Sequence, residues 1–198
     1  MSYVENFEWM FELETLTDEL EDQLMDELDG ACTTESGVHR VVLVVGGSSA
    51  QEAGMSSLTA LRASGARVVR AIEDLVTRGE IARRADVTAQ SVGNWLRGDR
   101  QASVVPPVPY VTAGVELWLW SEVKQWLAGL GISVDAGVNY PARTDYLAIN
   151  AAIYFSHKWS QISLPTRVMA NVTNVMAPAQ HLVAHPADNT AVHFGLAA

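Results

Sequence analysis

The sequence predicts a protein of the α+β class, with a small N-terminal α/β sandwich, a helix-rich middle segment and a C-terminal helical segment. Near the start, large apolar residues alternate with acids, which is typical of a strand with one buried face. Strand-like and helix-like stretches then follow one another over residues 1–76. From residue 77 on, the apolar residues recur every three or four positions, which favours helices.

The first strand is expected over residues 7–14, where the alternation of apolar and acidic residues is clearest. A helix follows, capped by either Thr15 or Thr17 and extending to about Leu28. Leucines at spacing four line one face of this helix, and several acids lie in its first turns, where the helix dipole favours negative charge. These features place a strand and then a helix at the start of the chain.

A continuous β-branched stretch over residues 39–45 predicts a central strand. Ser48 or Ser49 caps a second helix, which ends at Gly65, and residues 66–72 predict a third strand. The expected sandwich is therefore a three-stranded sheet with two helices on one side. The exposed edges of so small a sheet favour pairing with another copy or with a partner.

Charge divides the chain unevenly. The formal net charge is −10, and residues 1–76 hold 15 acids and 4 bases. Residues 77–142 hold six of each, and residues 143–198 hold two acids and three bases. Because such asymmetry indicates separate tasks, we expect an acidic module for dimerisation or partner binding at 1–76, a second module at 77–142, and a C-terminal helix with a weakly structured tail at 143–198.

The second module begins with two short helices joined by a tight turn. Thr77 caps the first helix, and Glu80 three residues later completes a capping box. Asp86 lies at the turn, and Thr88 caps the second helix. The inward-facing residues expected from the spacing are Ile81, Ala82, Ala85, Val87, Val92, Trp95 and Leu96.

The 21 residues from Thr77 to Arg97 resemble the helix-turn-helix of bacterial and phage regulators. The alanine, the turn, the two valines and the tryptophan stand at the expected places, although the usual glycine of the turn is replaced by Asp86. Aspartate tolerates a left-handed backbone better than most residues, so the departure is mild. An unrelated helical hairpin is the alternative interpretation.

The following segment extends this resemblance. A proline-rich stretch over residues 106–109 precedes an expected strand at 115–120, which carries tryptophans two positions apart and hence on one face. Ser121 is expected to cap a helix over 122–130. This order resembles excisionase-like and MerR-like winged domains and actinobacterial helix-turn-helix proteins, and it implies a β-hairpin wing from Tyr110 to the strand, packed by its tryptophans on the recognition helix.

The outer face of the second helix predicts contacts with double-stranded DNA. Glutamine and asparagine pair with adenine, and arginine pairs with guanine or a phosphate. We expect Gln90, Asn94 and Arg97 to read the major groove, with phosphate contacts from the arginines nearby. The full set of expected DNA-binding residues is Arg78, Thr88, Ala89, Gln90, Ser91, Gly93, Asn94, Arg97, Arg100 and Gln101.

The C-terminal third begins with a helix capped by Thr144 and Asp145 and running to about Trp159. This helix is expected either to close the winged domain or to pack between subunits. Beyond residue 160 the signals weaken. His181 and His185 have the spacing of a metal pair on a helix, but a third ligand is missing, so we expect no metal site and no cofactor.

Other classes of function find little support. The single cysteine, Cys32, forms neither an internal disulfide nor a cysteine-based zinc site, which fits a cytoplasmic protein. There is no signal peptide and no run of 18 apolar residues. The stretch 46–49 between a strand and a helix could cradle a phosphate, but it lacks the lysine of a nucleotide loop, which favours a plain turn and helix cap. No catalytic constellation is present, and we expect no enzyme.

Two hypotheses of function follow. In the first, a homodimeric transcriptional regulator, such as a repressor of phage origin, recognises a specific DNA sequence. In the second, a protein-interaction module such as an antitoxin or inhibitor binds a basic partner through its acidic N-terminal part. The acidic helix could equally be a solvated surface, which is the more common role of such a face.

Overall fold

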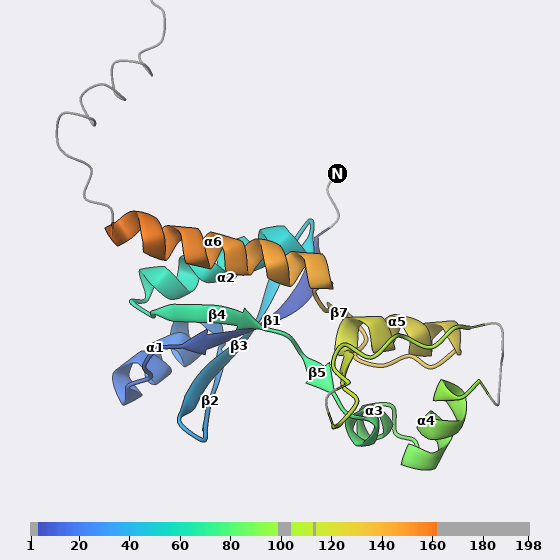
Figure 1. Cartoon of the computed structure of the whole chain (residues 1–198). Coiled ribbons are helices and arrows are strands. Elements are labelled where there is room, and N and C mark those ends of the chain that lie inside the picture. The colour runs from blue at the N-terminus through green and yellow to red at the C-terminus, as the bar shows by residue number, and fades with distance from the viewer. Residues whose placement is uncertain (1–3, 99–103, 113, 162–198) are drawn as a thin grey trace, which may run out of the picture. The chain divides into compact units, whose positions relative to one another are not determined.

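The computed structural model describes residues 4–98, 104–112 and 114–161 (Figure 1). The described chain is a mixed α+β structure with six helices and a mixed sheet. The described residues up to Trp159 form one compact unit, which holds two hydrophobic cores.

The first core lies against a five-stranded sheet in the described part of the chain. Four antiparallel strands run in the order β2-β3-β1-β4, and β7 pairs in parallel with the start of β1. With one helix after β1 and one after β3, this is the split β-α-β, or ferredoxin-like, arrangement. The strands are β1 (Glu5–Leu13), β2 (Ala31–Glu35), β3 (Val38–Gly47), β4 (Val68–Ile72) and β7 (Val138–Asn139).

The predicted three-stranded sheet is therefore wrong. The strand β2 had not been expected, and it forms a hairpin with β3 through Ser36 and Gly37. Both turn residues have positive φ, at 52° and 79°, as a two-residue hairpin turn requires. The strand β7 was missed because its partner, β1, lies more than 120 residues earlier in the chain.

Three helices contribute to the first core, namely α1 (Asp18–Leu28), α2 (Ala50–Ala63) and α6 (Arg143–Gln161). Thr17 caps α1 and Ser49 caps α2, in agreement with one of the two alternatives expected at each place. Figure 1 shows α2 and α6 side by side on one side of the sheet. The expectation that the helices of the sandwich share one face of the sheet is confirmed.

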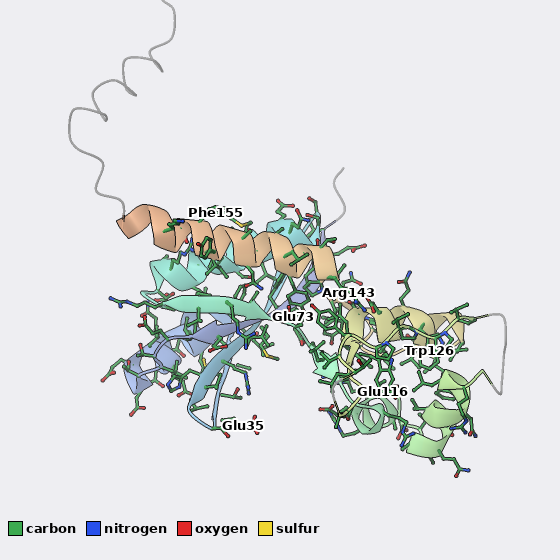
Figure 2. All side chains as sticks on the ribbon, viewed as in Figure 1. Glu35, Glu73, Glu116, Trp126, Arg143 and Phe155 are labelled. Carbon is green, nitrogen blue, oxygen red and sulfur yellow. The ribbon has the colours of Figure 1, made fainter. Side chains whose placement is uncertain are left out.

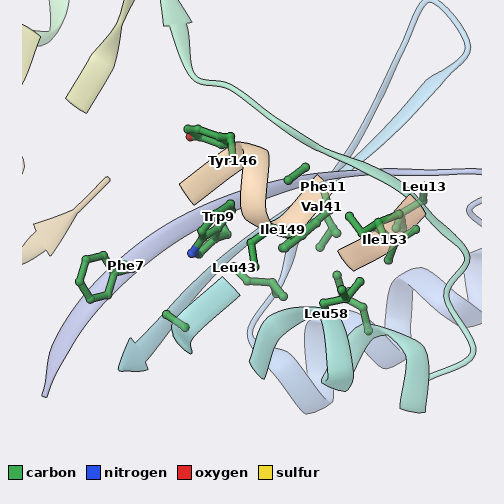
Figure 3. Close-up of a cluster of buried hydrophobic side chains, with 14 of the residues drawn as sticks. Phe7, Trp9, Phe11, Leu13, Val41, Leu43, Leu58, Tyr146, Ile149 and Ile153 are labelled. Carbon is green, nitrogen blue, oxygen red and sulfur yellow. The ribbon is translucent and has the colours of Figure 1, made fainter. Parts of the chain in front are cut away.

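Aromatic residues of β1 fill the space between the sheet and the helices (Figure 3). Trp9 and Phe11 are fully buried, and the indole Nε1 of Trp9 donates to the carbonyl of Ala50 at 3.1 Å. Gly54 brings α2 close, because a Cβ at that position would lie 2.7 Å from the ring of Trp9 and 2.9 Å from Ile149 of α6.

The helix α6 does not close the second module, contrary to one of the two expected roles. Its buried residues Tyr146, Ile149 and Ile153 belong to the first core. Its Asn150 accepts a hydrogen bond from the amide of Ala71 at 2.7 Å and donates to the carbonyl of the same residue at 3.1 Å. These bonds cover the outer edge of β4, which therefore does not offer Ala71 for pairing with another chain.

The second core is built from three helices and a two-stranded sheet. Val76, Ile81, Val92 and Leu127 are fully buried in it. The elements are β5 (Leu75–Val76), α3 (Arg78–Arg84), α4 (Ala89–Leu96), β6 (Trp118–Leu119) and α5 (Trp120–Gly129).

The strand expected at 115–120 is shorter than predicted, and Ser121 does not cap the following helix. The helix α5 already begins at Trp120, with Leu119 as its N-cap and no side-chain cap hydrogen bond. The amide of Trp120 donates to the carbonyl of Asp74 at 2.9 Å, at the point where the strand gives way to the helix. Trp118 and Trp120 are both buried, but they do not share the face of one strand.

An ion pair connects the chain after β4 to α3. Arg84 donates two hydrogen bonds to the carboxylate of Asp74, at 2.6 and 2.8 Å, and its guanidinium lies 4.6 Å from the centre of the Trp120 ring. Burial disfavours the charge of Arg84, but the hydrogen bonds and charge of Asp74 outweigh it and raise the pKa of the guanidinium. Arg84 thus stabilises the fold through Asp74 and Trp120, and its guanidinium is already engaged within the protein.

A second contact joins α6 to the second module. Arg143 donates to Glu122 of α5 at 2.5 and 2.8 Å, and it stacks over the ring of Tyr110 at 4.6 Å. Arg143 is labelled in Figure 2 where the chain passes from α5 to α6.

Candidate nucleic-acid interface

The two short helices α3 and α4 begin as the sequence predicts. At the start of α3, Thr77 Oγ1 accepts a hydrogen bond from the Glu80 amide at 3.2 Å. The Glu80 carboxylate in turn accepts one from the Thr77 amide at 2.7 Å, which completes the expected capping box. The bond from the Thr77 amide is the main reason that the pKa of Glu80 is lowered. The carboxylate is therefore charged and engaged within the helix cap.

The turn between α3 and α4 also has the expected geometry. Asp86 has a φ of 51°, a left-handed conformation that aspartate tolerates better than most residues. Thr88 caps α4 by accepting from the amide of Ser91 at 3.1 Å, and the two hydroxyl oxygens are 2.9 Å apart. The hydroxyls of Thr88 and Ser91 are thus bound to one another at the start of α4.

The exposed side of α4 carries most of the residues that the sequence assigns to DNA. Ala89 and Gln90 are exposed, and Asn94 is half-buried. Arg97, at the end of the helix, is exposed and donates to Asn94 Oδ1 at 2.5 Å. An amide, a second amide and a guanidinium therefore follow one another along this side.

Gly93, which the sequence placed on the outer face of α4, lines the groove described below and is buried under arginine side chains. A Cβ at this position would lie 3.5 Å from Nη1 of Arg97 and 3.6 Å from Nη1 of Arg78. The arginine from the start of α3 and the arginine from the end of α4 therefore converge over Gly93. This convergence of side chains 19 positions apart could not be read from the spacing within one helix.

A groove of about 770 Å³ opens beside the two arginines. Residues 110–112 and 114–117 pair as the two arms of a hairpin, in which the Leu117 amide donates to the Val111 carbonyl at 3.0 Å, and Gly114, Val115 and Glu116 line the groove. Glu116 is the one acid among the described residues that line the groove, and Figure 2 labels it. The groove is lined by Thr77, Arg78, Gly79, Gly93, Leu96, Arg97, Pro106, Pro107, Pro109, Gly114, Val115, Glu116 and Trp118.

Several of these lining residues were not assigned to a site from the sequence. The sequence pointed only to a proline-rich stretch over residues 106–109, and this composition was the available signal for a groove wall. Trp118 is 3% exposed, and its indole Nε1 has no acceptor in the described part of the chain. Arg100 and Gln101, which were expected to contact phosphates, lie outside the described residues.

Alternative sites gain little from the structure. Ser48 donates to the Glu52 carboxylate through both its amide, at 2.8 Å, and its hydroxyl. The Glu52 carboxylate thus accepts the hydrogen bond of the backbone amide that a phosphate at residues 46–49 would need. The stretch is therefore a turn followed by the helix cap at Ser49. Burial is the main cause that raises the pKa of the Cys32 thiol, with the charge of Glu21 as a second cause, which opposes formation of a reactive thiolate.

The described residues form neither a metal site nor a membrane-spanning helix. Among the residues that the structure describes, no three histidine, cysteine or acidic side chains come together as metal ligands. His181 and His185 lie outside the described residues. None of the described helices is both long and apolar enough to cross a membrane.

Comparison of the chain with protein-family models, with curated proteins and with solved structures found no match.

Proposed function

We propose that this protein binds double-stranded DNA and recognises a specific sequence through α4. The carrying observation is the pair α3 and α4, each capped at its start and joined through the left-handed Asp86, with Gln90 and Asn94 on the exposed side of the second helix. In this proposal the two helices and the hairpin at residues 110–117 act as a winged helix-turn-helix, and α4 lies in the major groove.

The chemistry of α4 suits base recognition. The primary amides of Gln90 and Asn94 can each donate to and accept from the edge of adenine. Ala89 presents only a methyl group at the start of the helix, which permits close approach to the groove and apolar contact with a thymine methyl. Asn94 is already oriented by the hydrogen bond from Arg97, so one of its rotamers is favoured before DNA binds.

The distribution of charge also favours an orientation in which α3 and α4 face the DNA. The exposed arginines of the two helices are Arg78, Arg83 and Arg97, whereas Glu80 is engaged in the helix cap. The sheet module instead carries the excess of acids. Phosphates are attracted to the first surface and repelled by the second, so the electrostatic field favours the approach of DNA to α3 and α4.

One such unit offers few cationic side chains to the backbone. We therefore propose that the protein acts as a homodimer, because two units on two half-sites multiply the affinity of one. The half-sites would lie about 34–36 Å apart or at a multiple of that distance. The role in the cell would be regulation of transcription, with repression as the simplest outcome of DNA occupancy.

Selection from a pool of random duplexes tests the proposal directly. The full chain is expected to enrich a sequence whose binding weakens steeply between 50 and 200 mM salt, since phosphate contacts dominate the affinity. The Gln90→Ala variant should lose about 1–3 kcal/mol of discrimination at one base pair and little at the others.

Gln125→Ala is the matched control, because Gln125 is also an exposed helical glutamine but lies on α5. It should bind the selected duplex like the unchanged protein. The proposal fails if no duplex is enriched, or if Gln90→Ala and Gln125→Ala show the same base preferences as the unchanged protein.

A second candidate function has one observation in its favour. The last turns of α1 carry Asp26 and Glu27, and Asp29 follows as the C-cap, while no basic residue lies in the last turn. Glu27 accepts hydrogen bonds from Gln23, and Asp29 forms the left-handed C-cap, whereas the side chain of Asp26 makes no hydrogen bond or ion pair within the described part of the chain. Negative charge at this end opposes the helix dipole. Binding of a basic protein partner by α1 would explain it, and loss of a co-purified partner from an Asp26→Asn, Glu27→Gln variant that still binds DNA would establish both functions.

A further inference from the structure

We infer that Arg78 and Arg97 bind one and the same backbone phosphate of the DNA, and that Gly93 leaves the space in which it sits. This inference rests on the proposed function and makes it specific, because it assigns an atom group of the ligand to three residues. It also removes Arg97 from the residues that read bases and assigns it to the backbone.

The first support is the distance between the two guanidinium groups. Nη1 of Arg97 and Nη1 of Arg78 lie 3.5 and 3.6 Å from the Cβ position of Gly93, so the two nitrogens are at most about 7 Å apart. Charge-assisted hydrogen bonds to a phosphate measure about 2.8 Å. A phosphate that accepts one such bond on each of two oxygens spans this gap without movement of either helix.

The second support is the choice of glycine in the middle of α4. Glycine weakens a helix interior, and Gly93 has no positive φ that would require it. The three nearest side-chain atoms to a Cβ there belong to arginines and lie at ordinary contact distances of 3.5–3.8 Å, so the packing of the fold does not require glycine either. What a Cβ would occupy is the space directly beneath the two guanidinium groups.

The third support is the lack of a competing anion for Arg78. It makes no hydrogen bond or ion pair with the part of the chain that the structure describes. The nearest carboxylate in sequence, Glu80, accepts instead from the Thr77 amide. Two positive charges held close together, one of them without an acid partner in the described chain, attract a single doubly accepting anion.

The test uses the full chain and the selected duplex, with each phosphate in turn replaced by an uncharged methylphosphonate. One position should weaken binding by the unchanged protein at least about tenfold, since a charge-assisted contact is lost. At that same position, and at no other, both Arg78→Ala and Arg97→Ala should show a smaller effect of the replacement, and the double variant should show none. Arg83→Ala, which removes another exposed arginine of α3, should retain the full sensitivity.

Salt dependence gives a second readout. The slope of log K against log salt concentration should change by about 0.9 in the double variant, which corresponds to one phosphate. Gly93→Ala should bind about tenfold more weakly while its thermal unfolding temperature does not fall.

Two results would overturn the inference and leave DNA binding intact. Arg78→Ala and Arg97→Ala could show the smaller effect at two different phosphates, or the slope could change by about 1.8, which corresponds to two phosphates. If instead the full chain binds no duplex at all, the proposed function itself fails and this inference with it.

Discussion

Replacement of Gly54 by alanine should destabilise the fold, although alanine is the better helix former. Gly54 lies in the interior of α2, where glycine costs about 0.5–1 kcal/mol relative to alanine. The added Cβ, however, would lie 2.7 and 2.8 Å from two ring atoms of Trp9 and 2.9 Å from Ile149. Both neighbours are buried side chains of the first core, and the indole is held by its bond to Ala50.

The magnitude follows from the balance of these two effects. Overpacking of a dense core costs about 1–3 kcal/mol, and a fully buried ring fixed by a hydrogen bond places Gly54→Ala near the upper end. After the gain in helix propensity, the free energy of unfolding should fall by about 2 kcal/mol. Gly93→Ala makes the same change in the interior of α4, where the nearest side-chain atoms belong to arginines, and should raise it by about 0.5–1 kcal/mol.

Urea denaturation followed by tryptophan fluorescence and by circular dichroism measures both variants against the unchanged protein. The two free energies of unfolding should differ by about 3 kcal/mol with opposite signs relative to the unchanged protein. A Gly54→Ala protein as stable as the original would refute the close packing of α2 against Trp9 and α6.

Three further changes test the contacts between elements. Asp74→Ala leaves the mostly buried Arg84 without its acid and should lower the free energy of unfolding by about 3 kcal/mol in urea denaturation. Burial, then the charges of nearby acids, raise the pKa of Glu8, so its proton binds more tightly in the folded state. Glu8→Gln should therefore stabilise the protein at pH 7, and the gain should vanish below about pH 4, as unfolding at several pH values will show. Asn150→Ala removes two hydrogen bonds to Ala71 and should accelerate hydrogen exchange of that amide.

A control variant and the opposite results test these three predictions. Arg67→Ala removes an exposed ion pair with Glu14 at 3.5 Å and should change stability by less than about 0.5 kcal/mol. A loss as large as that of Asp74→Ala would contradict the role of burial. Glu8→Gln would count against a raised pKa if it lowered stability at pH 7, and unchanged exchange at Ala71 would contradict the edge contact of α6.

Local features of the fold could be predicted from the sequence because their causes lie within a few residues. The capping box needs only Thr77 and Glu80, three positions apart, and the cap at Thr88 likewise engages Ser91. Asp86 was expected to tolerate the left-handed region because, in the resemblance to helix-turn-helix proteins, it stands where the turn usually has a glycine. These features depend on hydrogen bonds within one helical turn, which the order of residues determines.

Strands that pair over long distances were harder to predict. Residues 31–35 lack the apolar alternation of a buried strand because β2 is an exposed edge strand. The available signal was the pair Ser36 and Gly37, which favours a two-residue hairpin turn. The two residues of β7 carry no pattern at all, and only their contact with β1 defines them.

In the candidate site, too, local features could be predicted from the sequence and contacts between distant residues could not. The exposure of Gln90 follows from the period of α4 alone, whereas the burial of Gly93 depends on Arg78, which belongs to another helix. In the same way, Ile149 and Ile153 recur at the period of a helix and so share one face of α6, but this spacing does not identify the core that the face joins. The period of a helix shows which of its residues share a face, but which element packs against that face depends on the rest of the fold.

The return of α6 to the first core also bears on how the chain folds while it is being made. The second core draws on residues between Val76 and Tyr140, so α3, α4 and α5 can pack as soon as that stretch has left the ribosome. The first core instead waits for Ile153, about 80 residues after β4 ends at Ile72. At about 5–20 residues per second, the nascent sheet keeps the face that α6 will cover open to water for about 4–16 s. During that interval the unfinished N-terminal part exposes apolar surface, and the mutual repulsion of its many acids disfavours aggregation.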